Sequence, residues 1–371
     1  MIGRYIDISK GGDNRRSVET RPTRRATPTH RGILRAAVGI AAVFVLTLSS
    51  GCGLGGGPRP RNGYSPTTGL VPFLGLDDLG THSYGFGLGE GSGIVYTQRG
   101  GSIDVDHVRG AADITKHAYD LSYAALTQGK TTFSLSPPFE FYTNRVEFEY
   151  PETWGTLSEE AQRAIAHEVS LQVAQTVGYN STLYHEMLTW LGTRFLLVPE
   201  FYSAFSWEDV YSNLLGTHLA VRALQDPAGD YDQAMTRLLK AELEHLGVVS
   251  KDEAIRATNS VKGQWFTQGL LFPEISRRHL DIGLDDGYVT PALIPGVSEA
   301  EPLDYPAPVL DALDTYGFTM RYTIDSGHRA DRTMRDIAGA DGPIEPLKHY
   351  PAIMAYIEDE AIRVYGHDIG Q

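Results

Sequence analysis

The sequence predicts a mostly α-helical α+β fold, with a helical core, a small β-hairpin and long loops rich in glycine and proline. Apolar residues recur at helical spacing over much of the chain between residues 104 and 365. They alternate as in strands over residues 131–150. This periodicity is lost where glycine and proline gather, over residues 69–103 and 263–308, which indicates loops.

Charge and cysteine content exclude several kinds of site and partner. The 371 residues include 32 Lys and Arg, 46 Asp and Glu and one cysteine, for a net charge of −14. Residues 1–51 carry nine basic and three acidic residues (+6), so residues 52–371 carry 23 against 43 (−20). Because an acidic body repels phosphate backbones, we expect no nucleic-acid partner. A lone cysteine excludes an intramolecular disulfide, an all-cysteine zinc site and an iron–sulfur cluster.

The N-terminal region has the pattern of an export signal. Residues 1–35 are polar and basic, residues 36–48 are apolar, and residues 49–51 are small. The thirteen apolar residues are too few to span a bilayer, which takes about 20 in a helix. This order is typical of a secretory signal. With Cys52 where cleavage would fall, the segment resembles a bacterial lipoprotein signal, which implies lipidation of Cys52. The alternative is a signal anchor in which the cysteine is coincidental.

These observations predict three regions. Residues 1–51 form the signal region, residues 52–68 a flexible tether rich in glycine with three prolines, and residues 69–371 a single mostly helical domain. The protein is then expected in the bacterial cell envelope, lipid-anchored, on the periplasmic or outer-membrane side. Its partners would be the membrane, through the lipid anchor, and an envelope protein or cell-wall component.

The predicted elements follow in order along the chain. The glycine cluster of residues 69–103 lacks phosphate-loop spacing and is predicted as loop. A helix is expected over residues 104–127, and two strands over 131–150, interrupted by Pro137 and Pro138. A capping box of Thr156 and Glu159 predicts a helix that runs to residue 177 and ends at Gly178. A shorter helix over residues 181–191 should follow.

The remaining helices are predicted from their caps. Ser206 with Asp209 begins a helix that reaches about residue 224, and residues 231–246 form the next. Ser250 with Glu253 caps a further helix, and a last one is expected over residues 351–365.

The first candidate site lies at the start of the helix over residues 104–127. Asp104 and His107 are three residues apart and could share one helix face. His107 would be a metal ligand or a general base oriented by Asp104, and Arg109 would bind an anionic group of a substrate. The alternative is that Asp104 caps the helix and His107 is half-exposed.

The second candidate site is the run of His185 and Glu186. Two histidines four residues apart hold zinc in one protease motif, but the corresponding position here is Thr189. A metal held by His185 would therefore need ligands from another segment. A hairpin turning near Asn180 would place the preceding His167 about 10 Å out of register, too far to share a metal.

Other polar residues could support these two sites or have roles of their own. Asp209 and Asn213, four apart, would support the site together with Thr189, although Asp209 could instead cap its helix. Asp281 and Asp286 lack calcium-loop spacing and are expected to bond to their own loop. A separate group at three-residue spacing is predicted to form a solvated acidic face: Asp325, His328 and Asp331.

Four segments together resemble a known family. RGGSIDVDHVRGAAD, YHEMLTW, FSWEDVYSNLLG and RRHLDIGLDDGYVTP are similar to the bacterial putative-lipoprotein family called domain of unknown function 4056, from about residue 93 to about residue 295. The resemblance implies a lipoprotein and brings no reaction. The matched positions are Arg99, Gly100, Gly101, Asp104, His107, Arg109, His185, Glu186, Thr189, Trp190, Asp209, Asn213, Asp281 and Asp286.

Two functions remain open on the sequence. The first is a metal-dependent hydrolase, with zinc or another divalent metal on His107 and His185 and with Glu186 as general base. The second is a non-catalytic envelope lipoprotein that binds a partner or has a structural role, in which the same residues form buried networks. A third, glycan cleavage by Glu168 and Glu186, would require both carboxylates to face one cleft.

Overall fold

The computed structural model describes residues 57–366, except 62, 68, 70, 86, 139, 193, 196–197, 200–202, 269–272 and 298. By its contacts the chain divides into two compact units, Met1–Gly55 and Gly56–Gln371. All described residues belong to the second unit. The predicted signal region and Cys52 lie outside the described residues.

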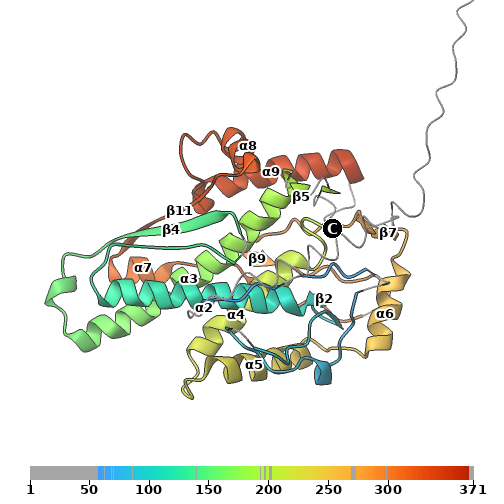
Figure 1. The fold of residues 1–371 in the computed structure, drawn as a ribbon, viewed down its shortest axis with the longest axis horizontal. Coiled ribbons are helices and arrows are strands. Elements are labelled where there is room, and N and C mark those ends of the chain that lie inside the picture. Colours follow the sequence, from blue (N-terminus) through green and yellow to red (C-terminus); the bar gives the residue numbers. More distant parts are fainter. Residues whose placement is uncertain are drawn as a thin grey trace, which may run out of the picture. The chain divides into compact units, whose positions relative to one another are not determined.

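The fold is α+β and mostly helical, as the sequence predicts (Figure 1). The helices of the described residues are α2 (Val105–Thr127), α3 (Glu159–Trp190), α4 (Asp209–Leu224), α5 (Tyr231–His245), α6 (Lys251–Ser260), α7 (Asp311–Tyr316), α8 (Arg329–Ala338) and α9 (Pro346–Tyr365), with short 3-10 turns η1 (Leu76–Asp78) and η2 (Trp154–Thr156). The strands are β1 (Ile94–Thr97), β2 (Gly101–Asp104), β3 (Thr132–Leu135), β4 (Tyr142–Glu149), β5 (Arg194–Phe195), β6 (Val198–Pro199), β7 (Phe266–Gln268), β8 (Pro273–Ile275), β9 (Tyr288–Val289), β10 (Tyr305–Pro306) and β11 (Thr319–Ser326).

Helix α2 packs against both α3 and α4 at the centre of the fold (Figure 1). Two glycines let the helix backbones come close. A Cβ on Gly216 of α4 would lie 2.1 Å from the carbonyl oxygen of Val108, and one on Gly178 of α3 would lie 2.1 Å from the Oγ1 of Thr115. Because no side chain fits in either place, these two glycines set the distances between the three helices.

Gly178 does not end a helix, contrary to the sequence prediction. Helix α3 runs unbroken from Glu159 to Trp190, and the expected hairpin near residue 180 does not form. Its N-terminal cap is Ser158, whose Oγ accepts a hydrogen bond from the N–H of Ala161 at 3.2 Å, and not the predicted Thr156. A mid-helix glycine costs about 1 kcal/mol relative to alanine, but here the close contact with α2 requires it.

The predicted strands are confirmed and belong to a larger sheet. Strands β3 and β4 pair antiparallel, and β11 joins the other edge of β4, with Tyr322 opposite Val146. Along β4 the side chains alternate between buried and more exposed, as expected for a sheet with one face on the core. Strand β11 was not predicted, although Met320, Tyr322 and Ile324 alternate with polar residues along it.

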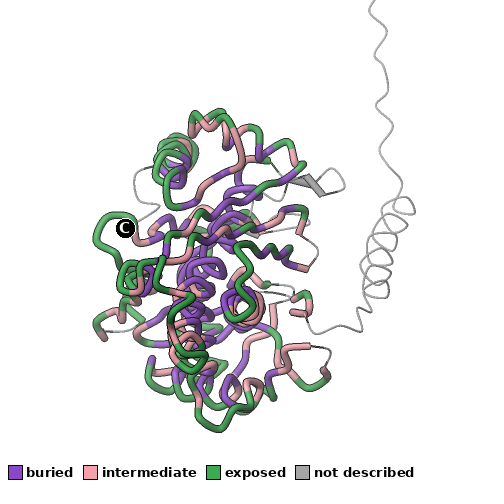
Figure 2. Tube along the Cα trace, turned by 90° about the vertical axis from the view of Figure 1, so that its left-hand side faces the viewer, coloured by how far each residue is buried: buried purple, intermediate pink, exposed green. Residues whose placement is uncertain are grey.

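Most buried apolar residues of this unit form one large cluster, and polar residues are buried beside it. Buried residues gather inside it, and exposed residues lie at its periphery (Figure 2). A smaller second cluster surrounds Trp207, which stacks on Phe266 with ring centroids 5.9 Å apart. Trp207 thereby fixes the turn just before α4, where the candidate site lies.

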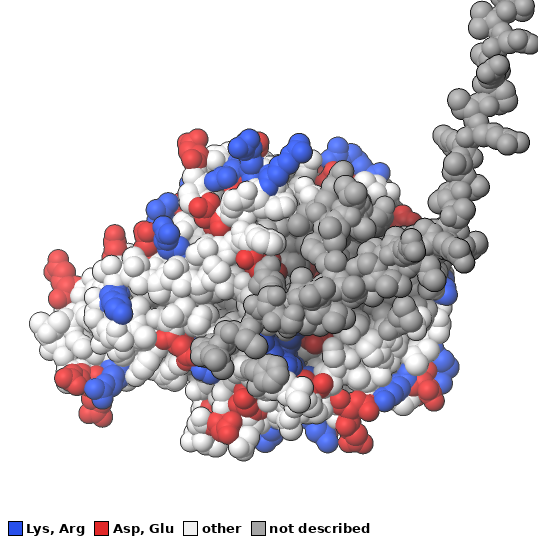
Figure 3. Space-filling model, viewed as in Figure 1, with Lys and Arg blue, Asp and Glu red and all other residues white. Residues whose placement is uncertain are grey.

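Acidic and basic side chains are interspersed on the face shown in Figure 3. None of the described helices combines the length and the apolar character that a membrane crossing requires.

The compact unit begins at Gly56, and the residues next to it are in contact with the domain. The sequence predicts that residues 57–67 belong to a flexible tether. In the structure Arg61 is almost fully buried and bonded to Glu90, and the N–H of Tyr64 is bonded to Asp104.

Candidate functional site

The candidate site lies where the first turns of α2 and α4 meet. Asp104 caps α2, because its Oδ1 accepts a hydrogen bond from the N–H of Asp106 at 2.8 Å. Its own N–H donates to the Oγ of Ser212 on α4 at 3.0 Å. This cross-link holds the start of α2 against α4 and directs His107 toward the N-terminus of α4.

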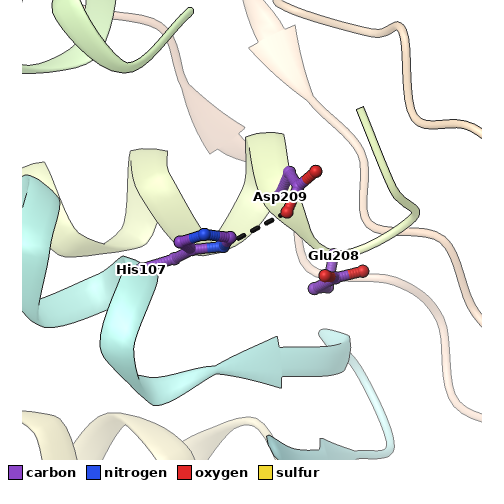
Figure 4. A group of neighbouring side chains, drawn as sticks. All are labelled: His107, Glu208 and Asp209. Atoms are coloured by element: carbon purple, nitrogen blue, oxygen red, sulfur yellow. Dashed lines mark ion pairs between the residues drawn. The ribbon is translucent and has the colours of Figure 1, made fainter. Parts of the chain in front are cut away.

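His107 lies between two carboxylates (Figure 4). Its Nδ1 is 3.2 Å from an oxygen of Asp209 and 3.5 Å from an oxygen of Asp104. The other Asp209 oxygen accepts a hydrogen bond from the N–H of Ser206 at 2.7 Å, so Asp209 both closes its turn and faces His107. Burial would lower the pKa of His107, but Asp104 and Asp209 outweigh burial and raise it well above its usual value.

Glu208 completes a group of three residues that could hold a metal ion. One ligand atom from each of His107, Glu208 and Asp209 lies within 4.8 Å of the others. Glu208 is fully buried; its Oε1 accepts a hydrogen bond from Ser206 at 2.6 Å, whereas its Oε2 has no hydrogen-bond partner among the described residues. Burial, with the neighbouring Asp209, raises the pKa of Glu208 well above its usual value.

This donor set fits a divalent cation. A buried carboxylate oxygen without a partner is costly, and a cation would satisfy it. An imidazole nitrogen with carboxylate oxygens suits zinc, manganese or iron. The three donors come from two elements, α2 and the start of α4, which the bond between Asp104 and Ser212 holds together.

Glu186 approaches the same site from α3. Its side chain is buried, and its Oε2 accepts a hydrogen bond from the N–H of Phe205 at 2.8 Å. Burial and the charge of Asp209 raise the pKa of Glu186 to about 7. Burial likewise raises the pKa of Asp104 to about 7. Two carboxyl groups that titrate near neutral pH therefore flank His107.

The backbone beside Glu186 is strained. Phe205 has a φ of 54°, and it is the one non-glycine residue with positive φ among those that the structure describes. Its N–H is bonded to Glu186, and its carbonyl accepts a hydrogen bond from the N–H of His279 at 2.9 Å. Such conformations persist where the surroundings hold them, often at functional sites.

His185 lies at the rim of the site and not in the metal group. Its Nδ1 is 2.9 Å from Glu140, and its side chain is 44% exposed. Burial would lower the pKa of His185, but Glu140 outweighs burial and raises it. The described group of possible ligands thus pairs His107 with Glu208 and Asp209 instead of with His185. Thr189 and Asn213, the predicted supporting residues, are both buried.

Arg109 does not face the site. Its guanidinium is buried and donates hydrogen bonds to the carbonyls of Gly91, at 2.6 Å, and Leu79, at 2.7 Å. It therefore fixes the loop that precedes β1, and this placement does not support the predicted role in binding an anionic substrate group.

The third alternative, glycan cleavage by Glu168 and Glu186, does not fit the structure. Both residues lie on the unbroken helix α3, 18 residues apart, which corresponds to about 27 Å along the axis. Glu168 instead accepts a hydrogen bond from Tyr316. His167 is equally far from His185 and lies 2.7 Å from the hydroxyl of Tyr119.

Two further predictions have opposite outcomes. The aspartates of the 281–290 loop bond to their own backbone, as expected: Asp281 accepts from the N–H groups of Gly283 and Thr290, and Asp286 from that of Tyr288. The solvated acidic face is wrong for Asp331, which is fully buried.

Glu208 was not among the site residues predicted from the sequence. It directly precedes Asp209, one of the predicted residues, in the segment FSWEDVYSNLLG, so the sequence shows that the two are neighbours. The burial of Glu208 cannot be predicted from the sequence, because this burial follows from the packing of Trp207 into the second apolar cluster.

Comparison with known proteins gives a family and no activity. No curated protein and no solved structure matches the chain. A family model matches residues 75–284, which include every member of the candidate site. Since that match covers more than half of the chain, this protein belongs to the family described as "Protein of unknown function (DUF4056)".

Proposed function

We propose that this protein is a lipid-anchored envelope protein with a metal-dependent hydrolase site where α2 meets α4. The observation that carries the proposal is the group of His107, Glu208 and Asp209, in which a buried carboxylate oxygen lacks a hydrogen-bond partner. Glu186, a buried carboxyl group with a pKa of about 7, approaches the same group.

The three residues would hold the metal, and the remaining polar residues would assist. A bound zinc or similar ion supplies a Lewis acid and a water of lowered pKa. Asp104 keeps His107 oriented. Glu186 has a pKa suited to a general base, which takes a proton from water near neutral pH and returns it to the leaving group.

The test is turnover by the metal-loaded full chain on a panel of model esters and amides. Glu186→Gln should keep the fold and the metal but lower turnover by about 100-fold or more, because general bases contribute about that much. Glu168→Gln, an exposed position on the same helix, is the matched control and should leave turnover unchanged. Equal turnover in both variants contradicts the proposed role of Glu186.

A second candidate function, a non-catalytic binding or structural role in the envelope, is favoured by one observation. Two surface pockets of about 460 and 400 Å³ both have Asp232 in their lining, and neither is lined by His107. Under this alternative the polar residues around His107 only fix the helix packing. This alternative would be supported if the full-length protein has neither metal nor turnover and if His107→Ala is less stable than the wild type.

The lipid anchor is tested separately. Cells fed a labelled fatty acid should incorporate the label into the wild-type protein and not into Cys52→Ala. Label in both proteins, or in neither, contradicts an anchor at Cys52.

A further inference from the structure

Residues 57–61 and 63–67, here called the arm, lie over the candidate site. The N–H of Tyr64 donates a hydrogen bond to Asp104 at 2.5 Å. Gly63 lies against the imidazole of His107, so closely that a Cβ would stand 2.0 Å from its Nε2. The arm thus contacts the site through its main chain, at a point where any side chain would collide.

Two arginines hold the arm at its other end. Arg61 is bonded to Asp113, to Glu90 at 3.0 Å and to the carbonyl of Ser83 at 3.0 Å, and only 3% of its side chain is exposed. Arg59 is bonded to Glu90 and donates to the carbonyl of Gly87 at 2.8 Å.

Glu90 and Asp113 form a buried acidic socket. Their side chains are 5% and 0% exposed, and both lie near the imidazole of His82, at 3.4 and 3.1 Å. The core itself places the Nε of Arg109 4.0 Å from Glu90, and the guanidinium of Arg61, whose forked donors match carboxylates well, is bonded directly to both Glu90 and Asp113. The arm supplies such a group from outside the helical core.

We propose that this surface is a binding site for an extended, basic polypeptide segment, filled in this structure by the arm of the same chain. Three features define the ligand: an arginine for the socket of Glu90 and Asp113, a glycine two residues later against His107, and a main-chain N–H for Asp104. Only the socket of Glu90 and Asp113 contacts a side chain of the ligand, and the other contacts are to its main chain. The surface therefore recognises mainly an extended backbone that carries one basic residue.

The arm and an external segment exclude one another. Either one covers the Nε2 of His107, so the arm also controls access to the candidate site. The net charge of −20 over residues 52–371 favours a basic ligand over an acidic one. The inference shares His107 with the proposed function but requires neither a metal nor turnover, so the two can fail separately.

The test opens the site in the full chain with Gly63→Val, whose side chain has no room beside His107. Gly85→Val is the matched control, because a Cβ there meets no atom within 4 Å. Hydrogen exchange of the segment with Tyr64 should be slow in the wild type and in the control, and at least about 10-fold faster in Gly63→Val, since the bond to Asp104 is lost.

The ligand probe is a fluorescent peptide with the sequence of residues 57–67, measured by anisotropy. It should bind Gly63→Val at least about 10-fold more tightly than the wild type, where the arm competes. A peptide carrying the same glycine-to-valine change should not bind. The double variant Arg59→Ala/Arg61→Ala releases the arm in a second way, and it should also bind the peptide.

Three results would overturn the proposal. Fast exchange at Tyr64 in the wild type would show that the arm does not cover the site. Unchanged exchange in Gly63→Val would show that the contact with His107 does not hold the arm. A displaced arm with no peptide binding to either opened variant would make the arm a cover and not the occupant of a peptide site.

Discussion

The Nδ1 of His107 lies 3.2 Å from the Oδ1 of Asp209, and this contact joins the N-terminal turns of α2 and α4. Carboxylates are favoured at helix N-termini because the helix dipole and the free N–H groups stabilise negative charge. Asp104 and Asp209 both occupy such positions, as the cap of α2 and the first residue of α4. Two helix starts that face each other therefore concentrate carboxylates around one imidazole, and these carboxylates raise its pKa.

The pKa of Glu186 predicts how the metal-free protein responds to pH. The folded value of about 7 lies above the usual 4.5, so the protonated form is favoured in the fold. The stability that Glu186 contributes is present below pH 4.5 and is lost as the pH rises through about 7. From pH 4.5 to pH 8 the wild type should lose about 3 kcal/mol relative to Glu186→Gln, which does not titrate.

Urea unfolding with a chelator present checks this difference. Both proteins are measured at pH 4.5 and pH 8, and Glu168→Gln provides the exposed control on α3. A stability difference between wild type and Glu186→Gln that stays constant with pH would mean that Glu186 does not titrate as a buried group.

The close approach of α2 and α4 predicts that Gly216 is sensitive to substitution. Gly216→Ala puts a methyl group 2.1 Å from the carbonyl oxygen of Val108, so the helices must separate. We expect a loss of about 1–3 kcal/mol in the free energy of unfolding, typical of overpacking. Gly110→Ala on α2 meets no atom within 4 Å and should be neutral, or stabilising by up to about 1 kcal/mol. Equal effects of the two substitutions in thermal unfolding would contradict the packing described.

Asp331 should be a stability determinant and not a surface residue. It accepts a hydrogen bond from Tyr184 and pairs with Arg335 at 2.6 Å. Asp331→Ala leaves the Tyr184 hydroxyl unpaired in the core, which should cost about 2 kcal/mol. Asp325→Ala, a substitution at a side chain that is 63% exposed, should cost little in chemical denaturation. A larger loss of stability in Asp325→Ala than in Asp331→Ala would contradict the burial of Asp331 and support the solvated acidic face predicted from the sequence.

Local signals predicted much of the fold. The capping box of Ser250 and Glu253 forms as expected, and α2, β3 and β4 lie where periodicity placed them. One error arose where a distant contact decides the outcome, whereas the hairpin of β1 and β2, in a stretch predicted as loop, is local. Gly178 has the sequence pattern of a helix end, but the close approach of α2 requires a glycine at this point inside α3. Strand β11 was also not predicted, although its apolar residues alternate with polar ones.

The candidate site was predictable only in part. His107 and Asp104 share a helix turn, so their proximity follows from local spacing. The contact with Asp209 depends on how α4 packs against α2, and the partnerless oxygen of Glu208 depends on its burial. The sequence could suggest a ligand from another segment, but it could not distinguish Asp209 and Glu208 from His185.

Elemental analysis of the full chain, purified without chelator, tests the central claim most directly. We expect near-stoichiometric zinc, manganese or iron in the wild type, and loss of this metal in His107→Ala and Glu208→Gln. His185→Ala should retain it, because His185 pairs with Glu140 outside the group. Protein that is folded but free of metal, even after incubation with each ion, would contradict the account, as would loss of metal in His185→Ala with retention in Glu208→Gln.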